Sequence, residues 1–269
     1  MANIWDLFDL KGKVFFVAGG ARDLGKDMAE ALAEAHGDGM ITSRTSESAQ
    51  TTAASLSSST GQTVLGHAMD ATDEASIAAA VDACVSKFGR IDVLINNVGG
   101  GGKSSPGEST KFEERRLADW DRIVQTNLTA PWLVAKAVAP IMQKQNSGSI
   151  VCIASIAGMI GRDRRVYKDG MMAQAFDYAA VKGGVIGLMR DMAAYLGDNQ
   201  IRVNAISPGG FERGQPQGFI DAYADKTILK RMGTDGLDLK GAAVFLASDA
   251  SGYVTGHNLV VDGGFTVYQ

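Results

Sequence analysis

Short apolar runs alternate with helical patterns along nearly the whole chain, and this rhythm constrains the fold more than any other feature. The apolar runs are rich in Val, Ile and Leu with little polar alternation, as is typical of parallel strands covered on both faces. Strands are predicted at 13–18, 39–43, 63–69, 91–96, 149–154, 200–206 and 257–262. Helices are predicted near 24–35, 46–58, 73–88, 117–144, 177–197 and 237–248. The pattern predicts an α/β class: a single-domain, doubly wound Rossmann fold over residues 1–269, with a seven-stranded parallel sheet.

Three segments interrupt this rhythm, and each follows a predicted strand. They span residues 99–110, 159–176 and 209–236, and they are expected to be loops. In open α/β sheets, ligands bind beyond the carboxyl ends of the strands, and long loops there are usually binding loops or lids. These segments are therefore expected to surround a ligand site.

Composition excludes several kinds of partner. The chain has 45% hydrophobic and 21% charged residues, as an ordinary globular protein has, and its formal net charge is −4. Nucleic acids and anionic membranes both require clustered positive charge, so neither is an expected partner. The scattered histidines show no metal-binding spacing, and no metal is predicted. A small-molecule substrate is expected.

The cysteines and the N-terminal residues bear on location. Cys84 falls in a helical pattern and Cys152 in an apolar strand, which predicts two buried free thiols rather than a disulfide. Asp6 and Asp9 interrupt the N-terminal stretch where a signal peptide would be apolar. No apolar run approaches the ~20 residues needed to span a bilayer. The expected location is the cytoplasm.

Residues 18–25, AGGARDLG, form a glycine-rich turn between the first predicted strand and helix. Such turns bind the pyrophosphate of a dinucleotide through backbone N–H groups and the helix dipole. Asp23, however, places a carboxylate in this turn. It is expected to cap the helix that begins at Leu24, in partial competition with a pyrophosphate, or instead to pair with Arg22.

A second motif lies at residues 178–182, YAAVK. Residues i and i+4 share one face of a helix, so the Lys182 ammonium is expected close to the Tyr178 phenol. A neighbouring positive charge favours phenolate and lowers the tyrosine pKa towards working pH. The pair is therefore a candidate general acid/base.

In combination, these motifs resemble the short-chain dehydrogenase/reductase family nearly end to end. Besides Ala18–Gly25 and the Tyr-x-x-x-Lys pair, the matching features are Asn96-Asn97-Val98-Gly99, Asn127, Ser155, Pro208-Gly209 and YVTGHNLVVDGG at 253–264. The turn departs from the family pattern because Asp23 replaces its middle glycine and Ala18 its threonine. The resemblance implies an oxidoreductase that interconverts a carbonyl and a secondary alcohol.

The resemblance also implies roles for individual residues. Tyr178 would exchange a proton with the substrate oxygen, and Ser155 would hydrogen-bond that oxygen. Lys182 would hold the nicotinamide ribose, and Asn127 would order a water that relays protons. The implied cofactor-binding residues are Gly19, Ala21, Arg22, Asp23, Leu24, Ser43, Arg44, Asp70, Ala71, Asn97, Val98, Gly99, Tyr178, Lys182, Pro208, Gly209 and Phe211.

The end of the second strand decides which nicotinamide cofactor is expected. An acid there binds the 2′-hydroxyl of NAD, whereas an arginine accommodates the 2′-phosphate of NADP. Asp38 has the spacing of the NAD acid but precedes the apolar residues of the strand. Arg44 follows that strand, and Arg22 can approach the same phosphate. NADP(H) is therefore the preferred prediction, with NAD(H) as the alternative.

The substrate is less constrained. Ser155 and Tyr178 lie 23 residues apart, farther than in many family members, and the intervening insert carries Arg162, Arg164, Arg165 and Lys168 against Asp163 and Asp169. Arginine pairs well with carboxylates, so the insert predicts a sugar acid as substrate. Neutralising Arg164 and Arg165 is then expected to raise the KM for an acidic substrate selectively. The insert and the tail of the substrate loop, including GGFERG, also resemble family members that act on sugars and sugar acids, such as gluconate dehydrogenases. The alternative substrate is a neutral ketone or polyol. The alternative role of the insert is a solvated or subunit-contacting loop. The alternative to an enzyme is a non-catalytic NADP(H) sensor.

Small residues in the helix at 177–197 allow close approach of another helix. They are Ala179, Ala180, Gly183, Gly184 and Gly187. In the family this helix packs across a two-fold axis, which implies a homotetramer, with a dimer as the alternative.

Overall fold

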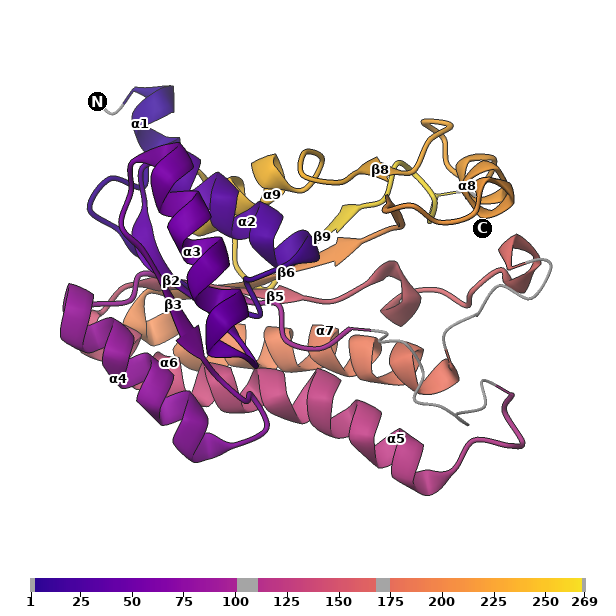
Figure 1. Ribbon diagram of the computed structural model, residues 1–269, viewed down its shortest axis with the longest axis horizontal. Helices are drawn as coiled ribbons and strands as arrows, with labels where there is room; N and C mark the ends of the chain where they lie inside the picture. The colour runs from indigo at the N-terminus through magenta and orange to yellow at the C-terminus, as the bar shows by residue number, and fades with distance from the viewer. Residues whose placement is uncertain (1–2, 101–110, 168–174, 268–269) are drawn as a thin grey trace.

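The computed structural model describes residues 3–100, 111–167 and 175–267. Its centre is a sheet of seven parallel strands in the order β3-β2-β1-β4-β5-β6-β9, which confirms the predicted doubly wound fold (Figure 1). The strands are β1 (Val14–Ala18), β2 (Asp38–Ser43), β3 (Val64–Ala68), β4 (Val93–Asn96), β5 (Gly148–Ile153), β6 (Ile201–Pro208) and β9 (Asn258–Val261).

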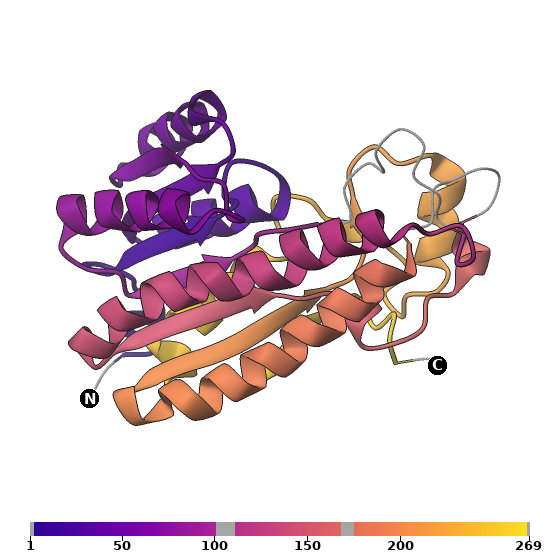
Figure 2. The same cartoon turned by 90° about the horizontal axis from the view of Figure 1, so that it is seen from below.

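Helices cover both faces of this sheet. On one face lie α2 (Asp23–Glu34), α3 (Ser46–Thr60) and α9 (Lys240–Ala247). On the other lie α4 (Glu74–Phe88), α6 (Ala130–Gln145) and α7 (Phe176–Leu196), seen from below in Figure 2. Phe15 and Phe16 are successive residues of β1, and each is buried in a different one of the two cores. Burial on both faces explains why the strands lack polar alternation.

The long helix predicted at 117–144 is divided. It consists of α5 (Leu117–Val124), a π-helical turn η1 (Gln125–Thr129) and α6. Pro131 follows this turn and has no N–H to donate to the Asn127 carbonyl four residues earlier, so regular α-helical bonding cannot continue there. A short helix α1 (Ile4–Phe8) precedes β1 and was not predicted.

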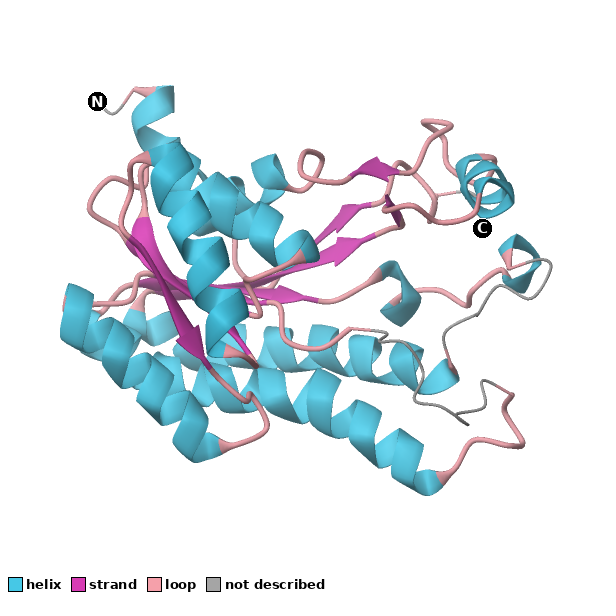
Figure 3. Ribbon diagram, viewed as in Figure 1, coloured by secondary structure: helices cyan, strands magenta, loops and turns pink. Residues whose placement is uncertain are grey.

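The segment 209–236 is more ordered than the predicted loop. It contains β7 (Phe211–Glu212), α8 (Gln217–Ala224) and β8 (Gly233–Thr234), as Figure 3 shows. This prediction was wrong because α8 is short, follows Gly214 and Pro216 and contains Gly218, and these residues hide its pattern. Tyr223 of α8 packs in a small cluster with Val166, Met232 and Phe265, so tertiary contacts stabilise the helix.

The shorter helical turns and the cysteines complete the framework. The 3-10 turns are η2 (Ile156–Gly158), η3 (Arg164–Val166), η4 (Gly197–Asn199) and η5 (Asp249–Ser251). Cys84 and Cys152 are buried and free, as predicted, and burial raises the pKa of each thiol to about 12. Within the described ranges, no helix has the length and apolarity to cross a bilayer.

The strand order reverses between β1 and β4, which places a topological switch point at the carboxyl edge of these two strands. The segments after β1, β4, β5 and β6 all emerge at this edge, as do the described parts of the three segments predicted to surround a ligand. Residues 101–110 and 168–174, including Lys168 and Asp169, lie outside the described residues.

Candidate active site

The turn after β1 leaves the start of α2 open. The N-cap position of this helix is Arg22 rather than Asp23, and the Arg22 side chain makes no capping hydrogen bond. The prediction that the Asp23 carboxylate caps the helix is therefore wrong. The alternative, a pair between Asp23 and Arg22, is confirmed, because Asp23 Oδ2 lies 3.8 Å from Arg22 Nε. Both side chains are largely exposed. The first N–H groups of α2 are not bonded by a capping side chain, which suits the binding of a pyrophosphate.

Two features give this turn its shape. Asn97, after β4, donates from Nδ2 to the Gly19 carbonyl at 2.9 Å and so ties the two strand ends together. Gly25 lies against the same carbonyl: a Cβ on it would meet Gly19 O at 2.0 Å and Asn97 Nδ2 at 2.5 Å. The third glycine of the motif is thus required for close helix–strand packing.

Asp23 occupies a strained position. Its φ is 51°, in the left-handed region that L-residues other than Gly, Asn and Asp rarely adopt. Glycine adopts this conformation without steric cost, so the residue type that the family pattern places here is also the one that the backbone favours.

We expect Asp23→Gly to stabilise the fold by up to about 1 kcal/mol and to bind NADPH as tightly as wild type or more tightly, since strain and a nearby negative charge are both removed. Thermal unfolding and fluorescence titration with NADPH test this. Asp23→Ala is the matched control: it removes the carboxylate but keeps the strained Cβ. A large loss of NADPH affinity in both variants would show that the carboxylate favours cofactor binding.

The adenosine end of the predicted cofactor site lies at the ends of β2 and β3. Ser43 ends β2, and the exposed Arg44 follows it. Asp70 follows β3, accepts two hydrogen bonds from Thr72, and has its pKa lowered by those bonds and by the charge of Arg44. Asp38 begins β2 at the opposite edge, as predicted, where it accepts from the Thr63 N–H at 2.6 Å. Arg44 therefore lies at the edge where the adenosine ribose is predicted to bind, and Asp38 lies at the opposite edge.

The predicted nicotinamide end of the cofactor site lies at the segments after β4 and β6. Val98 and Gly99 follow Asn97, and the Gly209 N–H donates to the Val261 carbonyl at 2.9 Å. The Phe211 ring is buried in the core, so any contact with a cofactor there would come from its backbone.

Tyr178 and Ser155 meet where α7 begins. Ser155 follows β5, and its Oγ accepts from the Ala157 N–H at 3.1 Å, which starts η2. It also hydrogen-bonds the Tyr178 side chain. Asp177 beside Tyr178 is fully buried in an ion pair with Arg115 at 2.5 Å. This pair joins the start of α7 to the segment before α5 and thereby holds the tyrosine in place.

The turn η2, which follows Ser155, packs closely on α7 at Lys182. A Cβ on Gly158 would meet the Lys182 carbonyl carbon at 2.4 Å and the Gly183 nitrogen at 2.5 Å, so only glycine allows η2 to lie directly on α7. The Lys182 ammonium lies 5.7 Å from the Tyr178 ring centroid, which confirms the expected shared face of the helix. It donates to the Ile153 carbonyl at 2.7 Å.

The expected lowering of the Tyr178 pKa by Lys182 is not found in the ligand-free protein. Burial raises the pKa of Tyr178, and the hydrogen bond with Ser155 and the charge of Arg162 only oppose this rise. Burial also lowers the pKa of Lys182 to about 8. The physical reason is that both groups lose hydration, and desolvation outweighs the attraction of neighbouring charges.

Asn127 lies in the π-helical turn and is buried. Its Oδ1 accepts from the Gly100 N–H at 2.6 Å, and its Nδ2 donates to the Ile123 carbonyl and to Thr126 Oγ1. The side chain therefore shapes the segment after β4. Its predicted part in a proton relay stays a prediction.

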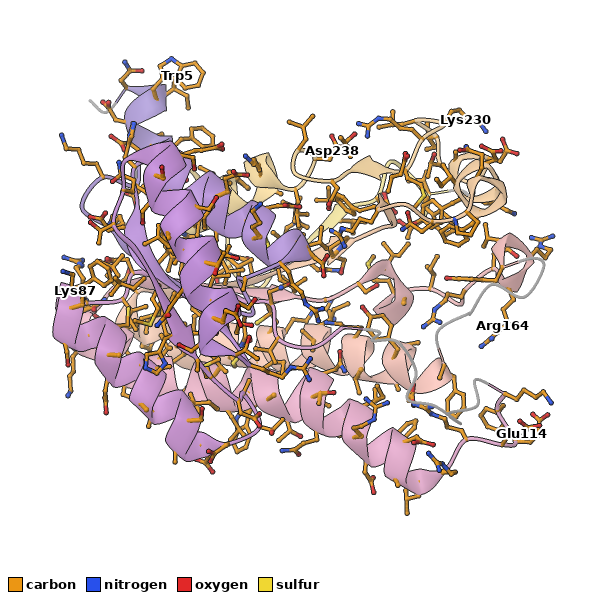
Figure 4. All side chains as sticks on the ribbon, in the orientation of Figure 1. Trp5, Lys87, Glu114, Arg164, Lys230 and Asp238 are labelled. Carbon is orange, nitrogen blue, oxygen red and sulfur yellow. The ribbon has the colours of Figure 1, made fainter. Side chains whose placement is uncertain are left out.

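The described arginines of the basic insert lie in different surroundings. Arg165 pairs with Asp163 at 2.7 Å and is largely exposed, and Arg164 is exposed as well. Figure 4 shows Arg164 at the same end of the molecule as Glu114. Arg162 lies beside Tyr178, with its Cζ 5.7 Å from the ring centroid of that tyrosine. The predicted effect of Arg164 and Arg165 on substrate binding stays a prediction.

Comparison with known proteins agrees with this arrangement. A family model described as enoyl-(acyl carrier protein) reductase matches residues 19–266. The chain is 34% identical to D-threitol dehydrogenase of Mycolicibacterium smegmatis, over 97% of this chain and 95% of that protein. The chain belongs to the short-chain dehydrogenase/reductase family. This short-chain dehydrogenase is accordingly an oxidoreductase of alcohols and ketones, in a family that binds NAD(P)(H).

Two further relatives are informative about cofactor and substrate. The enzyme is 35% identical to an NADP-dependent mannitol dehydrogenase of Hypocrea jecorina, over 98% of this chain and 96% of that protein. A crystal structure of gluconate 5-dehydrogenase from Burkholderia cenocepacia, in complex with NADP and tartrate, superimposes with a TM-score of 0.88 at 31% identity, covering 99% of this chain and 100% of that one.

Sequence reasoning missed two contributors to this site. The Arg115–Asp177 pair joins residues 62 positions apart, and no local pattern indicates such a contact. Gly158 also escaped notice, because the need for a glycine arises only where η2 meets α7.

Proposed function

We propose that this short-chain dehydrogenase is an NADP(H)-dependent enzyme that interconverts a carbonyl and a secondary alcohol, with a sugar acid or related polar keto compound as substrate. The observation that carries the proposal is the cluster of Tyr178, Ser155 and Lys182 at the carboxyl edge of the sheet, beside an uncapped helix start. A hydroxyl donor, a phenol and a buried ammonium within one small region are the groups that such a reaction needs.

The residues have distinct parts in this reaction. Tyr178 gives a proton to the substrate oxygen in reduction and removes it in oxidation. Ser155 donates a hydrogen bond to the same oxygen and stabilises charge that develops on it. Lys182 would hold the ribose hydroxyls of the cofactor, and it keeps a positive charge near the phenol. Bound NADP(H) supplies or accepts the hydride. Asn127 carries a water that returns protons to the cluster.

The preference for NADP(H) rests on Arg44, which follows β2, with Arg22 of the turn after β1 as a second arginine that can approach the same phosphate. We expect Arg44→Ala to raise the Kd for NADPH about 10-fold and to leave that for NADH nearly unchanged, because a charge-assisted hydrogen bond to the 2′-phosphate is lost. Fluorescence titration with both cofactors measures this, and NADH is the internal control. Equal loss for the two cofactors would contradict the preference.

The activity is tested by following NADPH oxidation with a panel of keto acids, ketones and ketoses, and NADP⁺ reduction with the matching alcohols. We expect turnover in both directions, faster with NADP(H) than with NAD(H). The threitol and mannitol dehydrogenases among the relatives favour a neutral polyol or ketone as the alternative substrate class. Cofactor binding without turnover of any compound would instead favour a non-catalytic sensor.

We also propose a homotetrameric assembly through α7, with a dimer as the alternative, and a cytoplasmic location. Gly187 and the exposed Tyr195 lie on α7, where a second copy would pack. Light scattering of the purified protein measures the assembly directly.

A further inference from the structure

Arg162 is the seventh residue after Ser155 and lies beside the reacting group. Its guanidinium carbon is 5.7 Å from the Tyr178 ring centroid, and its Nη2 donates to the Ala175 carbonyl at 3.4 Å, directly before α7. The side chain is half-buried, and a guanidinium keeps its charge even where burial lowers its pKa. A permanent positive charge therefore borders the position of the substrate carbonyl.

The other cations of the insert face a different partner. Asp163 accepts from Arg165 at 2.7 Å and from Lys226, next to α8, at 2.7 Å. One carboxylate thus bonds two cations and ties the insert to the segment that carries α8. Arg164 is exposed to solvent. Of the described arginines of the insert, Arg162 is the one that lies over the Tyr178 ring.

Aromatic packing fixes the backbone on the far side of Arg162. Val166 is buried, and Tyr167 packs on Phe219 of α8 with ring centroids 5.6 Å apart. Phe219 in turn contacts Tyr223 at 5.8 Å. With Asp163 anchored as well, the segment that carries Arg162 is held at several points, so little entropy is left to lose when the guanidinium meets a ligand.

We propose that Arg162 binds a carboxylate of the substrate and makes this enzyme selective for keto acids over neutral ketones. The planar fork of a guanidinium matches a carboxylate in two parallel hydrogen bonds, and a half-buried site strengthens them. The Arg162 guanidinium lies on the Tyr178 ring. One small substrate can therefore place its carboxylate on Arg162 and its reacting carbonyl at Tyr178. The inference deepens the proposed function and rests on it.

The experiment compares keto acids with neutral analogues in which CH₂OH replaces the carboxylate. Suitable pairs are 5-keto-D-gluconate with L-sorbose, 2-keto-D-gluconate with D-fructose, and 4-oxocyclohexanecarboxylate with 4-(hydroxymethyl)cyclohexanone. Steady-state kinetics with NADPH are measured for wild type, Arg162→Gln, Arg162→Lys and the matched control Arg164→Gln. Calorimetry measures binding of each compound to enzyme saturated with NADP⁺, which does not reduce a ketone. NADPH affinity and thermal unfolding check that each variant is folded.

We expect Arg162→Gln to raise both KM and Kd for the acids about 10- to 100-fold, with the neutral compounds nearly unchanged. Arg162→Lys should recover part of the loss, and Arg164→Gln should resemble wild type. Equal effects on acids and neutral compounds, or equal effects of the two glutamine variants, would overturn the inference. So would a wild type that prefers the neutral compounds, although the proposed activity would then stand. Acid binding that depends on Arg162 without turnover of any compound would support the inference and refute the proposed activity.

Discussion

Replacement of Tyr178 by phenylalanine is expected to lower kcat by about 10²- to 10⁴-fold, the usual contribution of a positioned general acid or base. The phenol that hydrogen-bonds Ser155 is lost, whereas the ring between Lys182 and Arg162 remains. NADPH oxidation with the best substrate of the panel measures the effect. Because only one oxygen is removed, thermal unfolding should shift little.

A matched control lies on the same helix. Tyr195 is 78% exposed on α7, far along the helix from the cluster, so Tyr195→Phe should leave kcat and KM unchanged. Cofactor titration should give the same Kd for wild type and Tyr178→Phe within about twofold. Unchanged turnover in Tyr178→Phe would remove this residue from the chemistry and with it the mechanism proposed above.

Lys182→Met is expected to abolish turnover while making the cofactor-free protein more stable at pH 7. Lys182 is 3% exposed, and burial lowers the pKa of its ammonium to about 8. At pH 7 it is charged in both folded and unfolded chains, so the folded state carries the cost of desolvating it. Methionine removes that cost but also removes the hydrogen bond to the Ile153 carbonyl. We expect the free energy of unfolding to increase by about 2 kcal/mol in total.

The pH dependence of this gain has a definite sign. Between pH 8 and the ordinary lysine pKa of about 10.4, the folded wild type has released the proton and the unfolded chain has not. The unfolded state then binds more protons, so wild-type stability rises with pH and the advantage of Lys182→Met shrinks. Urea unfolding at several pH values between 7 and 10.5 measures this, with Lys144→Met, at an exposed position on α6, as the control. A gain that is constant across this range would contradict the assignment, and a kcat within about twofold of wild type would show that Lys182 is dispensable for turnover.

The helices and strands that could be predicted from sequence are those whose buried residues follow the repeat of the element itself. The run KVFFVA at 13–18 reads as a covered strand because Phe15 and Phe16 both enter a core. The serine-rich stretch at 46–58 reads as a surface helix because Ala49, Ala53 and Leu56 recur on one face, and these three are its buried residues. Helix α8 could not be predicted in this way, since its stability comes from Tyr223 packing against distant residues.

The same division holds at the site. The order of the motifs along the chain determined the family, the strand ends at which the ligand site forms, and the presence of Tyr178, Ser155 and Lys182 within it. These features follow from chain order and from a helical repeat of i and i+4, which are properties of sequence alone.

Only the tertiary structure showed which partner each charge of the insert has. Four basic residues of the insert are equivalent in the sequence, yet Asp163 engages Arg165 and Lys226, and Arg162 lies on Tyr178. The direction of the Tyr178 pKa was decided in the same way. Burial and neighbouring charges come from segments that meet only when the chain is folded, and desolvation there outweighs the local i, i+4 attraction from which the sequence prediction was made.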